Sequence, residues 1–182
     1  HEAITQWQRD FQVQIGKNHA RYFDKNGWLY FTKEVFDLLY PSYGDTYPIY
    51  NGSIGMTYEQ AGGPEGGLGV LTSDGDTLTL YDRLIHHYTT SLSTIEIASQ
   101  NAAKLITEFK NYFANASNGN VGLYKTYIIK NQAADGQKVK ALLALLDKNN
   151  ILYGTGSGTG KGFNYETRKE EVFTIAPGDI VI

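Results

Sequence analysis

Apolar residues recur at spacings of three and four through residues 77–116. This spacing places side chains on one face of an α-helix, so the pattern predicts one long helix or two helices in series. An unbroken helix of this extent would be about 60 Å long at 1.5 Å per residue. Thr89, Thr90 and Ser91 mark the position at which we expect it to bend or divide. The series consists of Tyr81, Leu84, Ile85, Tyr88, Leu92, Ile95, Ala98, Ala102, Ile106, Phe109 and Phe113.

A second helix is predicted nearer the N-terminus, over residues 3–23. Asn26-Gly27 is a typical helix stop, and residues 28–31 then predict a strand or an extended segment. Residues 32–39 predict a short helix with Thr32 as its cap. The apolar face of the first helix would carry Trp7, Phe11, Ile15, His19 and Phe23, which recur every four residues.

The middle of the chain is rich in turn-forming residues, which dominate residues 40–53. Residues 53–59 then predict a strand that ends at the carboxylate of Glu59. The next segment, residues 61–67, is mostly glycine and predicts a loop.

A strand–helix–strand unit is predicted beyond the polar linker at residues 115–122. Its parts are a strand over residues 124–129, a helix over residues 135–149 and a strand over residues 151–153. Short links of this kind favour two parallel strands joined by a right-handed crossover.

The glycine-rich stretch at residues 154–162 superficially resembles a phosphate-binding loop. That motif requires Gly where Thr155 stands and Ser or Thr where Gly162 stands, so we expect a flexible loop instead. Residues 163–167 and 172–175 predict a hairpin, which a turn and a final strand would follow.

The composition excludes several classes of protein. With 41% hydrophobic and 19% charged residues, the chain is suited to a packed core rather than to disorder. A net charge of −3 without a basic patch argues against nucleic-acid binding. No apolar run is long enough for a membrane span. The absence of cysteine excludes disulfides, thiolate metal ligands and a cysteine nucleophile from this sequence.

Glu59 is the carboxylate that this pattern singles out. A carboxylate at the end of a strand, beside a glycine-rich loop, can reach a cleft while its backbone stays fixed. Such a group can act as a general base. The position equally suits a structural carboxylate that caps the loop or pairs with a Lys or Arg, so spacing alone leaves both roles open.

The stretch from Tyr40-Pro41-Ser42-Tyr43-Gly44-Asp45 through Thr57-Tyr58-Glu59-Gln60 resembles the region around the catalytic glutamate of zinc carboxypeptidases of the carboxypeptidase A type. It is most similar to a bacterial branch that carries a further domain after the peptidase. The resemblance implies that Glu59 is the general base, acting on a zinc-bound water. It also implies that Tyr40 contacts the peptide substrate, with Tyr43 as the other candidate.

The zinc ligands of that family are missing from this sequence. The family binds zinc through a His-x-x-Glu pair and a distant His, and none of the four histidines begins such a pair. His86-His87 does not replace it, because adjacent residues on a helix point in different directions. We therefore expect zinc in the parent protein but none bound by this chain alone, and we assign no metal ligand here.

Taken together, the patterns and the resemblance predict an α/β protein. Residues 1–118 would form the C-terminal part of a carboxypeptidase-like αβα sandwich, and residues 119–182 the start of a second α/β domain. The second segment is similar in fold to a glutamine-amidotransferase-like domain, although without cysteine it lacks that nucleophile.

Three further expectations follow from the resemblance. The ends of the chain look cut from a longer protein, so its missing N-terminal half would normally cover exposed edges and we expect self-association without it. The resembled branch is exported, which implies an exported or periplasmic protein. The alternative function is a non-catalytic module that keeps the fold without the metal and binds peptide or sugar through its Tyr-rich region, residues 40–58.

Overall fold

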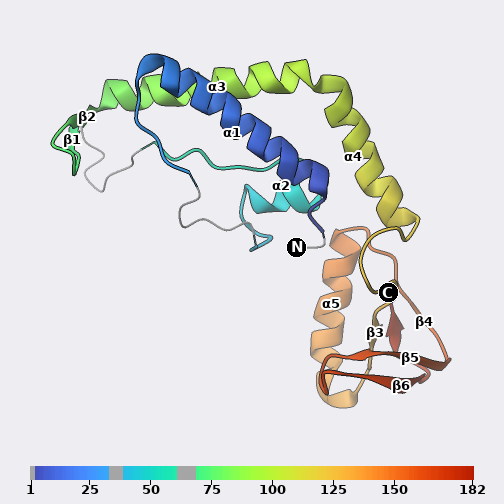
Figure 1. The fold of residues 1–182 in the computed structure, drawn as a ribbon. Helices are drawn as coiled ribbons and strands as arrows, with labels where there is room; N and C mark the ends of the chain where they lie inside the picture. The colour runs from blue at the N-terminus through green and yellow to red at the C-terminus, as the bar shows by residue number, and fades with distance from the viewer. Residues whose placement is uncertain (1–2, 33–38, 61–68) are drawn as a thin grey trace. The chain divides into compact units, whose positions relative to one another are not determined.

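The structure is a computed structural model that describes residues 3–32, 39–60 and 69–182. The chain divides into two compact units, His1–Gly122 and Leu123–Ile182, which are described separately below. Helices and small antiparallel sheets together make it a mixed α/β protein, as the sequence predicts. Figure 1 shows the order of the elements along the chain.

The first helix, α1 (Gln6–Asn26), confirms the predicted four-residue pattern. A capping box starts it, because the backbone N–H of Gln8 donates to Thr5 Oγ1 while the backbone N–H of Thr5 donates to Gln8 Oε1 at 2.9 Å. Gly27 ends it in the left-handed conformation at φ 68°, which glycine adopts without strain. The predicted apolar face is the buried one, with Phe11, Ile15 and Phe23 almost inaccessible to solvent.

The long apolar pattern forms two helices in series, α3 (Leu80–Gln100) and α4 (Ala102–Ser117). The chain bends between them at Asn101 (Figure 1), whose side-chain amide donates to the carbonyl of Ile97 at 2.8 Å. The predicted bend at residues 89–91 is wrong. Thr90 and Ser91 lie in continuous helix and donate their hydroxyls to carbonyls one turn earlier, which leaves the backbone ladder intact.

The polar side of α3 faces α1, and the two helices lie side by side (Figure 1). Arg83, Thr90 and Ser93 are the buried residues of α3, and Ser93 is fully buried. The predicted apolar stripe is instead exposed, and α1 contributes Asn18 and His19 as polar partners of the buried Ser93. The exposed stripe consists of Tyr81, Leu84, Tyr88, Leu92 and Ile95.

A short helix, α2 (Thr46–Tyr50), and the extended segment 54–60 complete the first unit beside the hairpin of β1 (Gly69–Leu71) and β2 (Thr77–Thr79). Residues 54–60 form no strand, so the strand predicted for residues 53–59 is wrong. Instead of pairing with a neighbouring strand, the carbonyls of Ser53 and Gly55 accept hydrogen bonds from side-chain amides of α1, as described below.

Two other predictions for this unit have different outcomes. Residues 28–32 also form no strand, which agrees with the extended alternative. The short helix predicted for residues 32–39 lies almost wholly outside the described residues, and the loop predicted for residues 61–67 lies entirely outside them.

In the second unit, α5 (Gly136–Lys148) follows a short 3₁₀ turn (Ala133–Asp135) and confirms the predicted helix. Three two-residue strands form one sheet in the order β3 (Ile128–Ile129), β7 (Ile180–Val181), β4 (Gly154–Thr155). Both β3 and β4 pair antiparallel with β7. The strand predicted for residues 151–153 is wrong, since the strand after α5 is β4, which begins at Gly154. The predicted direct parallel pairing of the two strands that flank α5 is also wrong, because β7 lies between β3 and β4.

The predicted hairpin is confirmed, with β5 (Gly158–Asn164) paired to β6 (Lys169–Ile175). Its first strand begins earlier than expected, and residues 165–167 form the turn instead of the predicted strand. Residues 158–162 of the predicted glycine-rich loop are therefore strand. Phe173 explains why glycines stand in this strand, because its ring lies over them: a methyl group at Gly160 would lie 2.8 Å from its Cζ atom. Glycine here makes room for an aromatic ring across the strand pair.

The αβα sandwich expected from the resemblance is not formed by the described residues, whose sheets are small and antiparallel. Within the same ranges, no helix combines the length and apolar character needed to cross a membrane.

Candidate functional site

Glu59 lies exposed at the end of the extended segment 54–60 and lines an open cleft of about 390 Å³. Tyr58 and Gln60 line the same cleft from this segment. The opposite wall comes from one face of α3, where Leu80, Arg83, Leu84 and His87 follow one another at helical spacing. The cleft thus combines a carboxylate, a guanidinium and an imidazole between apolar side chains.

The two adjacent histidines of α3 point to different surroundings, as expected for neighbours on a helix. His87 is exposed at the cleft. His86 packs in an aromatic cluster, with its ring centroid 4.6 Å from that of Trp28 and 5.3 Å from that of Phe23. Burial in this cluster lowers the pKa of His86 below its ordinary value.

The backbone that leads to Glu59 is fixed by side chains of α1. Gln8 is 2% exposed, and its amide nitrogen donates to the carbonyls of Ile49 at 2.9 Å and Ser53 at 2.7 Å. One helical turn later, Gln12 donates to the carbonyl of Gly55 at 2.8 Å. These bonds satisfy backbone groups that a strand ladder would otherwise satisfy, so the segment is held without belonging to a sheet.

Tyr58, directly before Glu59, is held by both helices. Its hydroxyl lies 2.5 Å from Thr94 Oγ1 of α3, and its ring meets the ring of His19 of α1 edge-to-face, with centroids 4.9 Å apart. Burial raises the pKa of Tyr58, an effect that the bond with Thr94 partly offsets.

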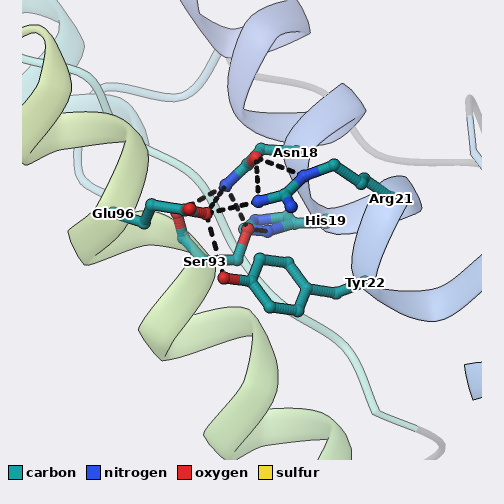
Figure 2. A network of polar contacts seen from close by, with 6 residues as sticks. All are labelled: Asn18, His19, Arg21, Tyr22, Ser93 and Glu96. Atoms are coloured by element: carbon teal, nitrogen blue, oxygen red, sulfur yellow. Dashed lines mark hydrogen bonds and ion pairs between the residues drawn. The ribbon is translucent and has the colours of Figure 1, made fainter. Parts of the chain in front are cut away.

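A polar network joins α1 to α3 beside this contact (Figure 2). Glu96 accepts hydrogen bonds from Asn18 at 3.0 Å and Tyr22 at 3.0 Å, and forms an ion pair with Arg21 at 2.6 Å. The pKa of Glu96 is lowered, chiefly by the bond from Asn18 and then by that from Tyr22. Its carboxylate is therefore engaged in holding the two helices together.

His19 and Ser93 form a second contact in this network, with Nδ1 2.8 Å from Oγ (Figure 2). The other ring nitrogen, Nε2, is buried and has no hydrogen-bond partner in the described part of the chain. Burial lowers the pKa of His19, so the ring is neutral near pH 7. Because Ser93 is fully buried, this Ser–His pair is structural and does not present a nucleophile to a substrate.

The structure does not bring the predicted substrate tyrosine to Glu59. Tyr40 and Tyr43 are each 57% exposed and contact one another edge-to-face, with ring centroids 5.1 Å apart. Neither belongs to the residues that line the cleft. The two predicted site residues, Glu59 and Tyr40, thus occupy separate surfaces of the described structure.

The side chains present do not fit a zinc site. Among the described residues, no three His, Asp or Glu side chains are grouped closely enough to hold a metal ion. No step of a reaction is therefore assigned to a metal within this chain.

The contributions of α3 to the cleft were not predicted from the sequence. Arg83 and His87 lie four residues apart, a spacing that shares a helix face and could have linked them. No known protein-family model, curated protein or solved structure matches this chain.

Proposed function

We propose that this chain is part of a zinc-dependent carboxypeptidase in which Glu59 is the general base. One observation supports it most: Glu59 lies exposed in a cleft, at the end of a segment that is anchored by a hydrogen bond from Gln8 to the carbonyl of Ser53 and by the contact between the hydroxyls of Tyr58 and Thr94. A general base needs both access to substrate and a fixed position. A carboxylate that merely capped a loop would not need this support.

In this proposal, Glu59 accepts the proton of the water that attacks the carbonyl of the last peptide bond. Arg83, a largely buried cation, lies in the same cleft wall, and positive charge there suits an anionic group such as the terminal carboxylate of a peptide. The metal expected from the resemblance would need ligands beyond the described residues, so we expect this chain alone to be inactive.

The test compares Glu59→Gln with the unchanged sequence in the longer natural protein loaded with zinc. Glutamine keeps the shape of the side chain and cannot accept the proton. We expect kcat for N-blocked dipeptides with a free C-terminus to fall by about 10²–10⁴-fold with little change in KM. Glu170→Gln, on the exposed face of β6, is the matched control and should keep full activity. Retention of activity within tenfold in Glu59→Gln would refute the proposal.

A second candidate is a non-catalytic module that binds peptide or sugar. The observation that favours it is the exposed, edge-to-face pair of Tyr40 and Tyr43, since exposed aromatic rings suit such ligands. Calorimetric titration of this chain with peptides and oligosaccharides tests it. Binding that is lost in Tyr40→Ala and kept in Glu59→Gln supports the module, and absence of binding to either ligand class rejects it.

A further inference from the structure

The hydroxyl of Tyr58 connects the residue before Glu59 to α3. Thr94 Oγ1 lies 2.5 Å from it and can also donate its own proton to the carbonyl of Thr90 at 2.8 Å. The hydroxyl of Tyr58 also lies 2.8 Å from Met56 Sδ, to which it can donate, so either hydroxyl can be the donor in the contact between Tyr58 and Thr94. The contact joins the segment before Glu59 to α3 whichever hydroxyl donates.

The ring of Tyr58 is fixed on its other side by α1. His19 meets it edge-to-face, and the ring nitrogen Nδ1 of His19 is in turn 2.8 Å from Ser93 Oγ of α3. Tyr58 thus closes a ring of contacts that passes from the segment to α1, from α1 to α3, and from α3 back to the segment. A side chain held at its ring and its hydroxyl leaves its backbone little freedom to rotate.

We propose that Tyr58 is a positioning residue for Glu59, and that its hydrogen bond to Thr94 sets the direction in which the carboxylate enters the cleft. The inference rests on the proposed function for its catalytic consequence. The backbone of Glu59 follows that of Tyr58 directly, and both residues line the cleft. A rotation of the tyrosine therefore moves the carboxylate relative to Arg83 and His87 on the opposite wall.

Tyr22 provides a matched control for this contact. Its hydroxyl also bonds a side chain of α3, donating to Glu96 at 3.0 Å, and the residue is likewise half-buried (Figure 2). It lies on α1, and among the described residues none of its hydrogen bonds or ring contacts reaches residues 54–60. Tyr22→Phe and Tyr58→Phe therefore each remove one hydroxyl that reaches α3, and only one of them is next to the proposed base.

The experiment has two arms. In the longer zinc-loaded protein, we expect Tyr58→Phe to lower kcat by about ten- to hundredfold while KM changes less than twofold, and Tyr22→Phe to leave kcat within twofold. Thr94→Val should lower kcat to the same extent as Tyr58→Phe. Thr94→Ser, which keeps the hydroxyl oxygen, should retain the kcat of the unchanged protein. In this chain alone, the NMR resonances and amide dipolar couplings of Glu59 should shift in Tyr58→Phe and Thr94→Val, and stay unchanged in Tyr22→Phe.

The outcomes separate this inference from the proposed function. If Glu59→Gln is inactive while Tyr58→Phe keeps kcat within twofold, Glu59 is the base and Tyr58 does not position it. If Glu59→Gln stays active, the proposed function fails, and the NMR arm alone decides whether Tyr58 orients Glu59. Unchanged Glu59 signals in Tyr58→Phe overturn the positioning role, as do equal shifts in both tyrosine variants.

Discussion

The approach of residue 55 to α2 can be tested by adding a single methyl group. In Gly55→Ala, the new Cβ would lie 1.7 Å from the carbonyl oxygen of Asp45 and 3.1 Å from Cγ1 of Ile49. Ordinary contacts are 3.4–4 Å, so the two segments would have to separate by about the length of a carbon–carbon bond, roughly 1.5 Å. That separation would also break the bond from Gln12 to the carbonyl of Gly55.

The energetic cost has two parts. Overpacking of a well-packed site costs about 1–3 kcal/mol. Loss of the hydrogen bond from Gln12 adds about 1 kcal/mol. We therefore expect the free energy of unfolding of the first unit to fall by about 3 kcal/mol, a large share of the stability of a typical domain.

Urea titration followed by tryptophan fluorescence measures this change. Both tryptophans, Trp7 and Trp28, lie in the first unit, so the signal reports that unit and not the second. Gly16→Ala is the control: it lies inside α1 with open space around it, and alanine should stabilise the helix by up to about 1 kcal/mol. A Gly55→Ala variant within about 0.5 kcal/mol of the unchanged protein would show that no tight approach exists.

Two further predictions concern the buried polar groups of each unit. Gln8→Leu removes the donor to the carbonyls of Ile49 and Ser53, so the same titration should show a loss of about 2–3 kcal/mol, and a loss below about 0.5 kcal/mol would contradict this role. The pKa of Asp179 is lowered to about 2, chiefly by its bond with Lys130, so its contribution to stability is present above the unfolded pKa of about 3.9 and disappears as the pH falls toward 2. Amide NMR signals of the second unit should report this acid-induced loss, and Asp179→Asn should abolish that part of the pH dependence.

Local signals predicted the helices well. In α1, the four-residue spacing, the capping residue Thr5 and the stop at Gly27 all agree with one another. The bend at Asn101 was missed because the apolar spacing continues through it, and an asparagine gives only a weak stop signal. The polar interior of α3 was missed for another reason: which side of a helix is buried depends on its neighbour, and here α1 presents Asn18, His19 and Tyr22.

Pairings over long distances in the sequence were not predictable from local patterns. The segment that ends at Glu59 has the residue pattern of a strand, but its carbonyls at Ser53 and Gly55 accept hydrogen bonds from Gln8 and Gln12, more than forty residues earlier. For the site, the sequence alone indicated Glu59. Arg83 and His87 could be assigned to the wall of the cleft only from the three-dimensional structure. The insertion of β7 between β3 and β4 likewise leaves no local mark in the sequence.

The central place of β7 has a consequence for the order in which the second unit can form. Within the described ranges, residues 128–129 and 154–155 pair with no strand other than residues 180–181, so neither ladder exists until that late segment has arrived. The hairpin of β5 and β6 needs only near neighbours and can form first. During synthesis on the ribosome, the two short strands β3 and β4 would therefore stay unpaired until the chain has emerged past residue 181, and a chaperone has its best chance to bind in that interval.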